Sequence, residues 1–131
     1  MARTEFTVYS VVSTGVTATY SSGSTDGNKF DNTGVEFLHV INAATSDSRT
    51  VEIVPTFSLD GNDLEHKQVT LTAATSSTIP TEMFMGTWKP SVYNQTSGTD
   101  VNMVYVNYIT SSGSTSYEAD LTGLTIAVLG R

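Results

Sequence analysis

The sequence contains no cysteine and only three prolines, one tryptophan and two histidines among its 131 residues. Without cysteine, the chain can form neither a disulfide framework nor a thiolate metal site. Its fold must therefore rest on a packed core, and a chain of this length can bury about two thirds of its unfolded surface in one domain. We expect no cofactor.

Positive charge is also scarce, because six Lys and Arg stand against thirteen Asp and Glu and give a formal net charge of −7. Such a chain is repelled by nucleic-acid phosphates and by anionic membrane surfaces, so we expect neither as a partner. No apolar run approaches the roughly 18 residues of a membrane-spanning helix, and the first ten residues lack the apolar segment of a secretory signal. We therefore expect a soluble protein without an export signal.

Hydroxyl side chains are abundant, with 22 Thr and 16 Ser. They accompany a period-two alternation of β-branched and aromatic residues, which indicates strands with one polar face. The alternation predicts strands over residues 5–12, 16–20, 35–42, 49–54, 67–72, 101–109 and 121–129. A hairpin turn is expected at Asp60-Gly61-Asn62, and Pro55 should end the strand before it.

Between these strands, residues 21–34 are rich in turn chemistry and predict a surface loop that Phe30 anchors. A helical turn competes only near residues 82–85. The whole pattern predicts an all-β fold, a single-domain, jelly-roll-like β-sandwich of seven to nine short strands. We expect residues 13–131 to form this sandwich, with residues 1–12 as an N-terminal arm or as its first strand.

The sequence lacks the residue sets of common catalytic sites. His39 lies in an apolar strand and is expected to be structural, while His66 lies in a polar loop, and neither has a ligand-like residue nearby in the sequence. The Asp60–Asp63 segment lacks the order of a calcium-binding loop. No nucleophile elbow or phosphate-binding glycine loop is present, so we expect a protein that is not an enzyme and binds no metal.

Several motifs then follow one another in a characteristic order: Asn32-Thr33-Gly34 leading into VEFLHVIN (35–42), the Asp60-Gly61 turn, an alternating VTLTA segment, the Tyr93-Asn94 pair and a terminal Ala127-Val128-Leu129. This order resembles that of small tailed-phage head proteins of the decoration, cement or minor structural class. The resemblance covers residues 32–131. The chain departs from it in longer loops at 21–29 and 111–116 and in having Gly130 before Arg131.

The resemblance implies a virion structural protein that binds the major capsid protein on the outer surface of the head. Such proteins commonly assemble as trimers and brace the capsid against internal DNA pressure. Alternatives are another phage part, such as a tail-tube or head-completion protein, or a small carbohydrate-binding β-sandwich module that would use Tyr105, Tyr108 and Tyr117 as its platform.

Two groups of residues are candidates for these contacts. A terminal strand can add to the edge of a neighbouring protein, so Phe6, Val8, Tyr9 and Val11 are candidate capsid contacts, unless the segment is simply the first strand of the sandwich. Tyr105 and Tyr108 are candidate oligomer contacts, with ordinary core packing as the alternative.

Overall fold

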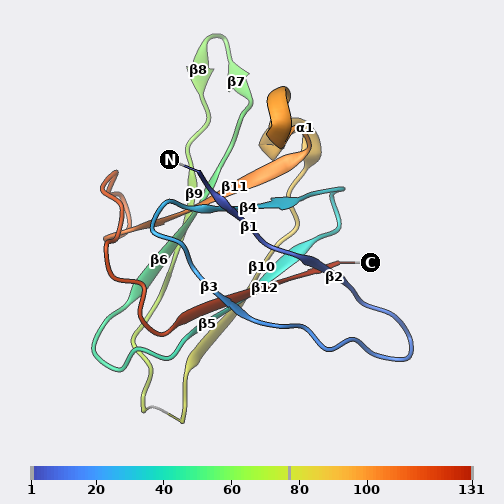
Figure 1. Cartoon of the computed structure of the whole chain (residues 1–131). Coiled ribbons are helices and arrows are strands. Elements are labelled where there is room, and N and C mark those ends of the chain that lie inside the picture. Colours follow the sequence, from blue (N-terminus) through green and yellow to red (C-terminus); the bar gives the residue numbers. More distant parts are fainter. Residues whose placement is uncertain (1, 77, 131) are drawn as a thin grey trace.

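Ten strands form two five-stranded sheets that pack face to face in the computed structural model, which describes residues 2–76 and 78–130 (Figure 1). Sheet A has the order β1 (Thr4–Glu5), β4 (Asn28–Asp31), β11 (Met103–Ile109), β6 (Arg49–Val54) and β9 (Lys67–Leu71). Sheet B has the order β10 (Thr81–Gly86), β5 (Phe37–Asn42), β12 (Leu124–Gly130) and β2 (Val8–Ser10), and β3 (Ser21–Ser22) also pairs with β12.

The remaining elements are short. A hairpin of β7 (Ser58–Leu59) and β8 (Asn62–Asp63) projects beyond the sheets (Figure 1). Its turn residues Asp60 and Gly61 both have positive φ, as a two-residue hairpin turn requires. The helical elements of the described chain are α1 (Pro90–Tyr93) and a 3₁₀ turn (Gly98–Asp100).

The core lies between the sheets and is built by the apolar alternation of the strands. Leu38 and Val40 of β5 face Val51 and Ile53 of β6 across this space, while the residues between them point outward. The fully buried members of the core are mostly aliphatic: Phe30, Leu38, Val40, Val51, Ile53, Val104, Val106, Ile126 and Val128. The predicted all-β sandwich is confirmed.

One side of the sandwich is closed by the N-terminal segment, which contributes an edge to each sheet. β1 pairs in parallel with β4 of sheet A, and β2 pairs in parallel with β12 of sheet B. Phe6, between β1 and β2, is buried in the core. The segment therefore forms part of the sandwich and fills the gap between its sheets.

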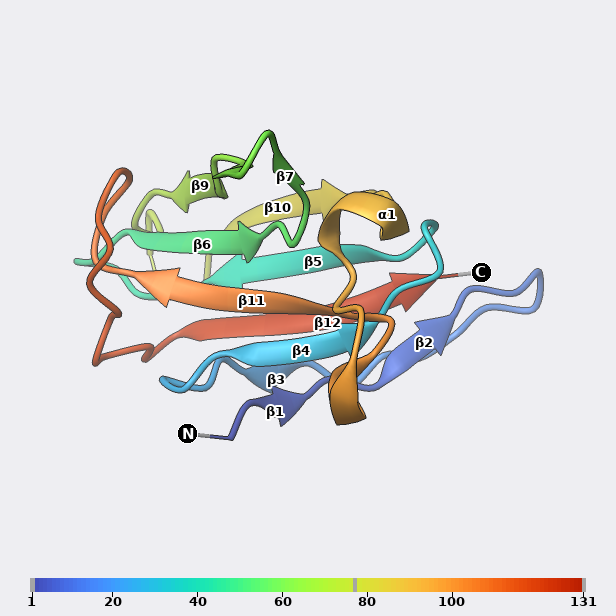
Figure 2. The ribbon, with the colours of Figure 1, turned by 90° about the horizontal axis from the view of Figure 1, so that it is seen from above.

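The opposite side ends in β9 and β10, which lie together along one border of the molecule while β1 and β2 lie along the other (Figure 2). Within residues 2–76 and 78–130, β9 pairs only with β6 and β10 pairs only with β5. Each of these two strands therefore has one free edge.

Four sequence predictions need correction. The predicted loop 21–34 contains β3 and β4, and Phe30 is more than an anchor because it lies fully buried within β4. The predicted strand 16–20 is not a strand. Residues 82–85 form no helical turn but belong to β10, where Met83 and Met85 face inward, and the described chain has twelve short strands instead of seven to nine.

Candidate functional site

The two outer faces of the sandwich differ in chemistry. On sheet B, the outward positions are largely apolar, and Glu82 is their one carboxylate: Tyr9, Phe37, His39, Ile41, Glu82, Phe84, Thr125, Ala127 and Leu129. We call this set the docking face. Phe84 has 67% of its surface exposed, which is unusual for a phenylalanine in a strand. Apolar groups gathered on one outer face are typical of interaction surfaces.

The outer face of sheet A is polar by contrast. Glu52 of β6 is buried there and accepts hydrogen bonds from Asn107 (3.0 Å) and Gln68 (2.8 Å). The loop after β11 lies over this cluster, since the backbone N–H of Gly113 donates to the Gln68 side chain at 2.6 Å. Most polar atoms of this cluster are thus paired within the chain and lie under the loop, whereas Asn107 Oδ1 is buried without a hydrogen-bond partner among the described residues.

His39 lies at the centre of the docking face and holds it together. Its Nε2 is 2.9 Å from a carboxylate oxygen of Glu82, and its Nδ1 is 2.5 Å from the Tyr20 hydroxyl. The Phe84 ring stacks on the imidazole with ring centroids 4.3 Å apart and an interplanar angle of 12°. Both ring nitrogens are engaged, as expected of a structural histidine, and the side chain fixes Phe84 in place.

The chain between β2 and β3 borders the docking face and carries no charge. Residues 10–25 contain no Asp, Glu, Lys or Arg. This loop extends away from the sheets (Figure 2), and Val11, Val12 and Val16 are exposed on it. Tyr20 brings the returning chain back to the sheet through its hydrogen bond to His39.

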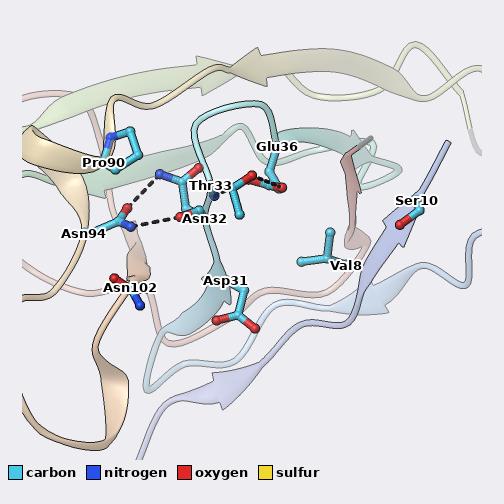
Figure 3. A pocket seen from close by; sticks show the side chains of 9 residues that line it. All are labelled: Val8, Ser10, Asp31, Asn32, Thr33, Glu36, Pro90, Asn94 and Asn102. Atoms are coloured by element: carbon cyan, nitrogen blue, oxygen red, sulfur yellow. Dashed lines mark hydrogen bonds between the residues drawn. The ribbon is translucent and has the colours of Figure 1, made fainter.

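A polar hollow of about 550 Å³ lies at one end of the sandwich, beside β2 (Figure 3). On its wall, Asn32 and Asn94 form a reciprocal pair, because Asn32 Nδ2 donates to Asn94 Oδ1 at 2.7 Å and Asn94 Nδ2 donates to the Asn32 carbonyl at 2.8 Å. Two motifs 62 residues apart in the sequence therefore meet here. Both amides are buried, so this pair joins the end of β4 to the chain that follows α1.

Glu36 lies next to this pair and is almost fully buried. Burial alone would raise the pKa of its carboxyl, but hydrogen bonds from the backbone N–H and the hydroxyl of Thr33 outweigh burial and hold the pKa below its ordinary value. Gly130 makes room for this carboxylate, because an added Cβ there would lie 3.2 Å from Glu36. The Asn32-Thr33-Gly34 and Tyr93-Asn94 motifs thus have a structural role at this end of the molecule.

The structure places the four candidate capsid contacts in different surroundings. Phe6 is a core residue and offers no surface to a partner, which corrects its assignment as a contact. Val8 faces inward and lines the polar hollow, Tyr9 belongs to the docking face, and Val11 is exposed at the start of the loop. Of the four, Tyr9 and Val11 remain available to a partner.

The two candidate oligomer contacts are engaged by other residues of the same chain. Tyr108 is 3% exposed and donates a hydrogen bond to Asn28 Oδ1 at 2.7 Å, and burial raises the pKa of its phenol. Tyr108 is therefore a core residue, in agreement with the alternative prediction of ordinary core packing. Tyr105 donates to Asp100 at 2.6 Å, and the Arg3 guanidinium lies 4.2 Å above its ring.

Sequence reasoning missed the partners of both histidines. His66 Nδ1 lies 3.1 Å from Glu52, and His39 pairs with Glu82. These partners are 14 and 43 residues away in the sequence and meet only because the strands pair across the sheets. A search for short-range spacing could not have found them.

Comparisons with known proteins yield no relative. No protein-family model, no curated protein and no solved structure matches this chain. Among the described residues, no helix is long and apolar enough to cross a membrane, and no group of three or more His, Asp and Glu side chains is arranged to hold a metal ion.

Proposed function

We propose that the protein is a non-enzymatic virion structural protein that decorates and stabilises a phage head by binding the major capsid protein on its outer surface as an oligomer. The single observation that carries this proposal is the docking face, which is largely apolar and in which His39 contacts Glu82, Tyr20 and Phe84. The phage head is proposed as the partner because the order of motifs in residues 32–131 resembles that of tailed-phage head proteins.

The chemistry of the docking face fits a protein partner better than a charged polymer. Its surface offers the exposed Phe84 ring and aliphatic groups around it, with one carboxylate at Glu82. A flat protein surface with few charges can bury these groups, and aromatic anchors of this type dominate the binding energy of protein interfaces. The net charge of −7 disfavours nucleic acid as the partner.

The experiment measures binding to purified heads of the phage that encodes the chain, by co-sedimentation. Ile41→Asp adds a charge to the docking face beside Glu82, and Thr70→Asp adds the same charge to the outer face of sheet A as the matched control. We expect Ile41→Asp to lower the affinity about tenfold or more, because a buried charge without a partner is costly in an interface. The control should bind like the wild-type protein.

Circular dichroism of both variants confirms that they are folded before binding is compared. Wild-type protein that does not sediment with heads would overturn the proposal. Equal loss of binding by both variants would show that the docking face is not the contact. Binding to a glycan array instead of to heads would favour the carbohydrate-binding alternative, for which Tyr105, Tyr108 and Tyr117 were the expected platform, although Tyr108 is buried.

A further inference from the structure

Sheet B ends at β10 in a free strand edge that borders an apolar groove. β10 has six residues and pairs only with β5 in the described part of the chain. The groove beside it measures about 380 Å³, and its lining is mostly apolar, with Lys67 and Thr87 as polar members: Lys67, Val69, Met83, Phe84, Met85, Gly86, Thr87, Trp88 and Tyr93. Natural sheets rarely leave a long apolar edge unprotected, because its free N–H and C=O groups pair with any available strand.

The other border of the molecule is protected differently. There the outer edge of β12 is covered by β3 along its first half and by β2 along its second half. Both covering strands are very short, and edge strands of this kind discourage further pairing. Only the β9 and β10 border therefore offers long free edges among the described strands.

Residues 16–20 of the same chain also have main-chain groups that are free within the described structure, and could pair with such a strand edge. Residues 16–20 alternate Val16, Ala18 and Tyr20 with two threonines, which is the pattern of a strand. In the described residues, however, none of their main-chain groups is hydrogen-bonded to another main-chain group. The segment is uncharged and Val16 is exposed, so it can approach a strand edge without charge repulsion.

We propose that residues 16–20 of one copy of this protein add as a strand to the free edge of β10 in a second copy. The main-chain groups that lack partners in the segment and along β10 then satisfy each other, and alternate side chains of the segment lie over the groove. This inference deepens the proposed function, because it names the contact that makes the oligomer on which that function rests.

The placement of the two elements makes the contact head-to-tail. The loop of residues 11–20 leaves the molecule on the β2 side, whereas β10 lies along the opposite border (Figure 2). Each copy can therefore give its loop to one neighbour and receive the loop of another. Such heterologous contacts generate closed rings when the rotation closes, and a ring of three agrees with the trimer expected for a decoration protein.

Cysteine cross-linking tests the contact directly, because the natural chain has no cysteine. Val16→Cys and Thr17→Cys, whose side chains alternate in direction, are each combined with Phe84→Cys on β10. Neighbouring strands bring paired Cβ atoms to about 4.5–5.5 Å, which permits a disulfide. Val16→Cys combined with Thr70→Cys, on the outer face of sheet A, is the matched control.

We expect one of the two test pairs to give cross-linked multimers on a non-reducing gel, ending at a single closed species, and the control pair to give none. Thr17→Pro, which removes a main-chain donor from the exposed loop, should convert the oligomer to monomer in light scattering while circular dichroism stays unchanged. A monomeric wild-type protein, an oligomer that survives Thr17→Pro, or absence of cross-links from both test pairs overturns the inference.

The outcomes for assembly and for head binding are separable. An oligomer that cross-links as expected but does not bind heads contradicts the proposed function and leaves the strand-addition contact intact. A protein that binds heads but is not joined through residues 16–20 contradicts only the contact.

Discussion

Phe6 lies where the N-terminal segment crosses from sheet A to sheet B, and its burial explains why that segment stays on the protein. Truncating Phe6 to Ala removes the ring from the core and leaves a cavity between the sheets. We expect Phe6→Ala to lower the free energy of unfolding by about 3–5 kcal/mol, measured by urea denaturation. Val12→Ala is the control, because Val12 is exposed and its truncation should cost less than about 0.5 kcal/mol.

The carboxyl of Glu52 makes the free energy of unfolding depend on pH. Burial alone would raise the pKa of Glu52, but hydrogen bonds from Asn107, Gln68 and His66 outweigh burial and hold the pKa below its ordinary value of 4.5. A folded-state pKa below the unfolded value adds stability that is complete above 4.5 and is lost as the pH falls through the folded-state value.

We therefore expect the free energy of unfolding to fall as the pH drops below 4.5, the ordinary pKa of a glutamate, and Glu52→Gln to weaken this fall. Glu36 shifts in the same direction, so part of the pH dependence should remain in the variant. Urea unfolding at a series of acidic pH values measures the effect, with exposed Glu65→Gln as the control. Identical pH profiles for wild type and Glu52→Gln would contradict the assignment.

The elements divide into those that local sequence specifies and those that it does not. The predicted strands 35–42, 49–54, 67–72, 101–109 and 121–129 all contain observed strands, because each has enough alternating apolar residues to fill one face of a core. The hairpin turn at Asp60-Gly61 was also correct, since its backbone geometry depends on neighbouring residues alone.

Local pattern failed where a distant partner decides the structure. β4 is polar in sequence, yet Asn28 and Phe30 are buried because β1 and β11 pair with it on both sides. Residues 16–20 alternate as a strand does but have no strand beside them. Of the residues on the docking face, the sequence predicted only Tyr9 as a contact. The other aromatic residues of this face lie on strands that are far apart in the sequence, and no motif connects them.

Removing residues 2–12 tests the N-terminal segment as an element. The deletion takes away β1, β2 and Phe6, and it exposes the edges of β4 and β12. We expect the shortened protein to lose its cooperative thermal transition, measured by circular dichroism. A truncated protein that melts like the wild type and fails only to bind heads would instead show that the segment is an attachment arm.

Across the whole molecule, the two outer faces are treated in opposite ways. Sheet A covers the Glu52 cluster of its polar face with its own loop, whereas sheet B presents a largely apolar face to the outside. The proposed strand addition at β10 would extend sheet B across neighbouring copies and join their docking faces into one surface. In such a ring, several docking faces bind the repeating partner surface at the same time. The ring therefore binds with a higher affinity than one copy does, although each copy makes the same contact.

Sheet B cannot form completely until β12 has been synthesised. β12 is the middle strand of sheet B, and its partners β2, β3 and β5 all precede it in the sequence. Val8 pairs with Val128, so a strand made among the first residues must wait for one made among the last. Contacts of such long sequence separation slow folding. Until β12 leaves the ribosome, the apolar strands of sheet B stay open to other chains, and this protein is expected to depend on chaperones while it is made.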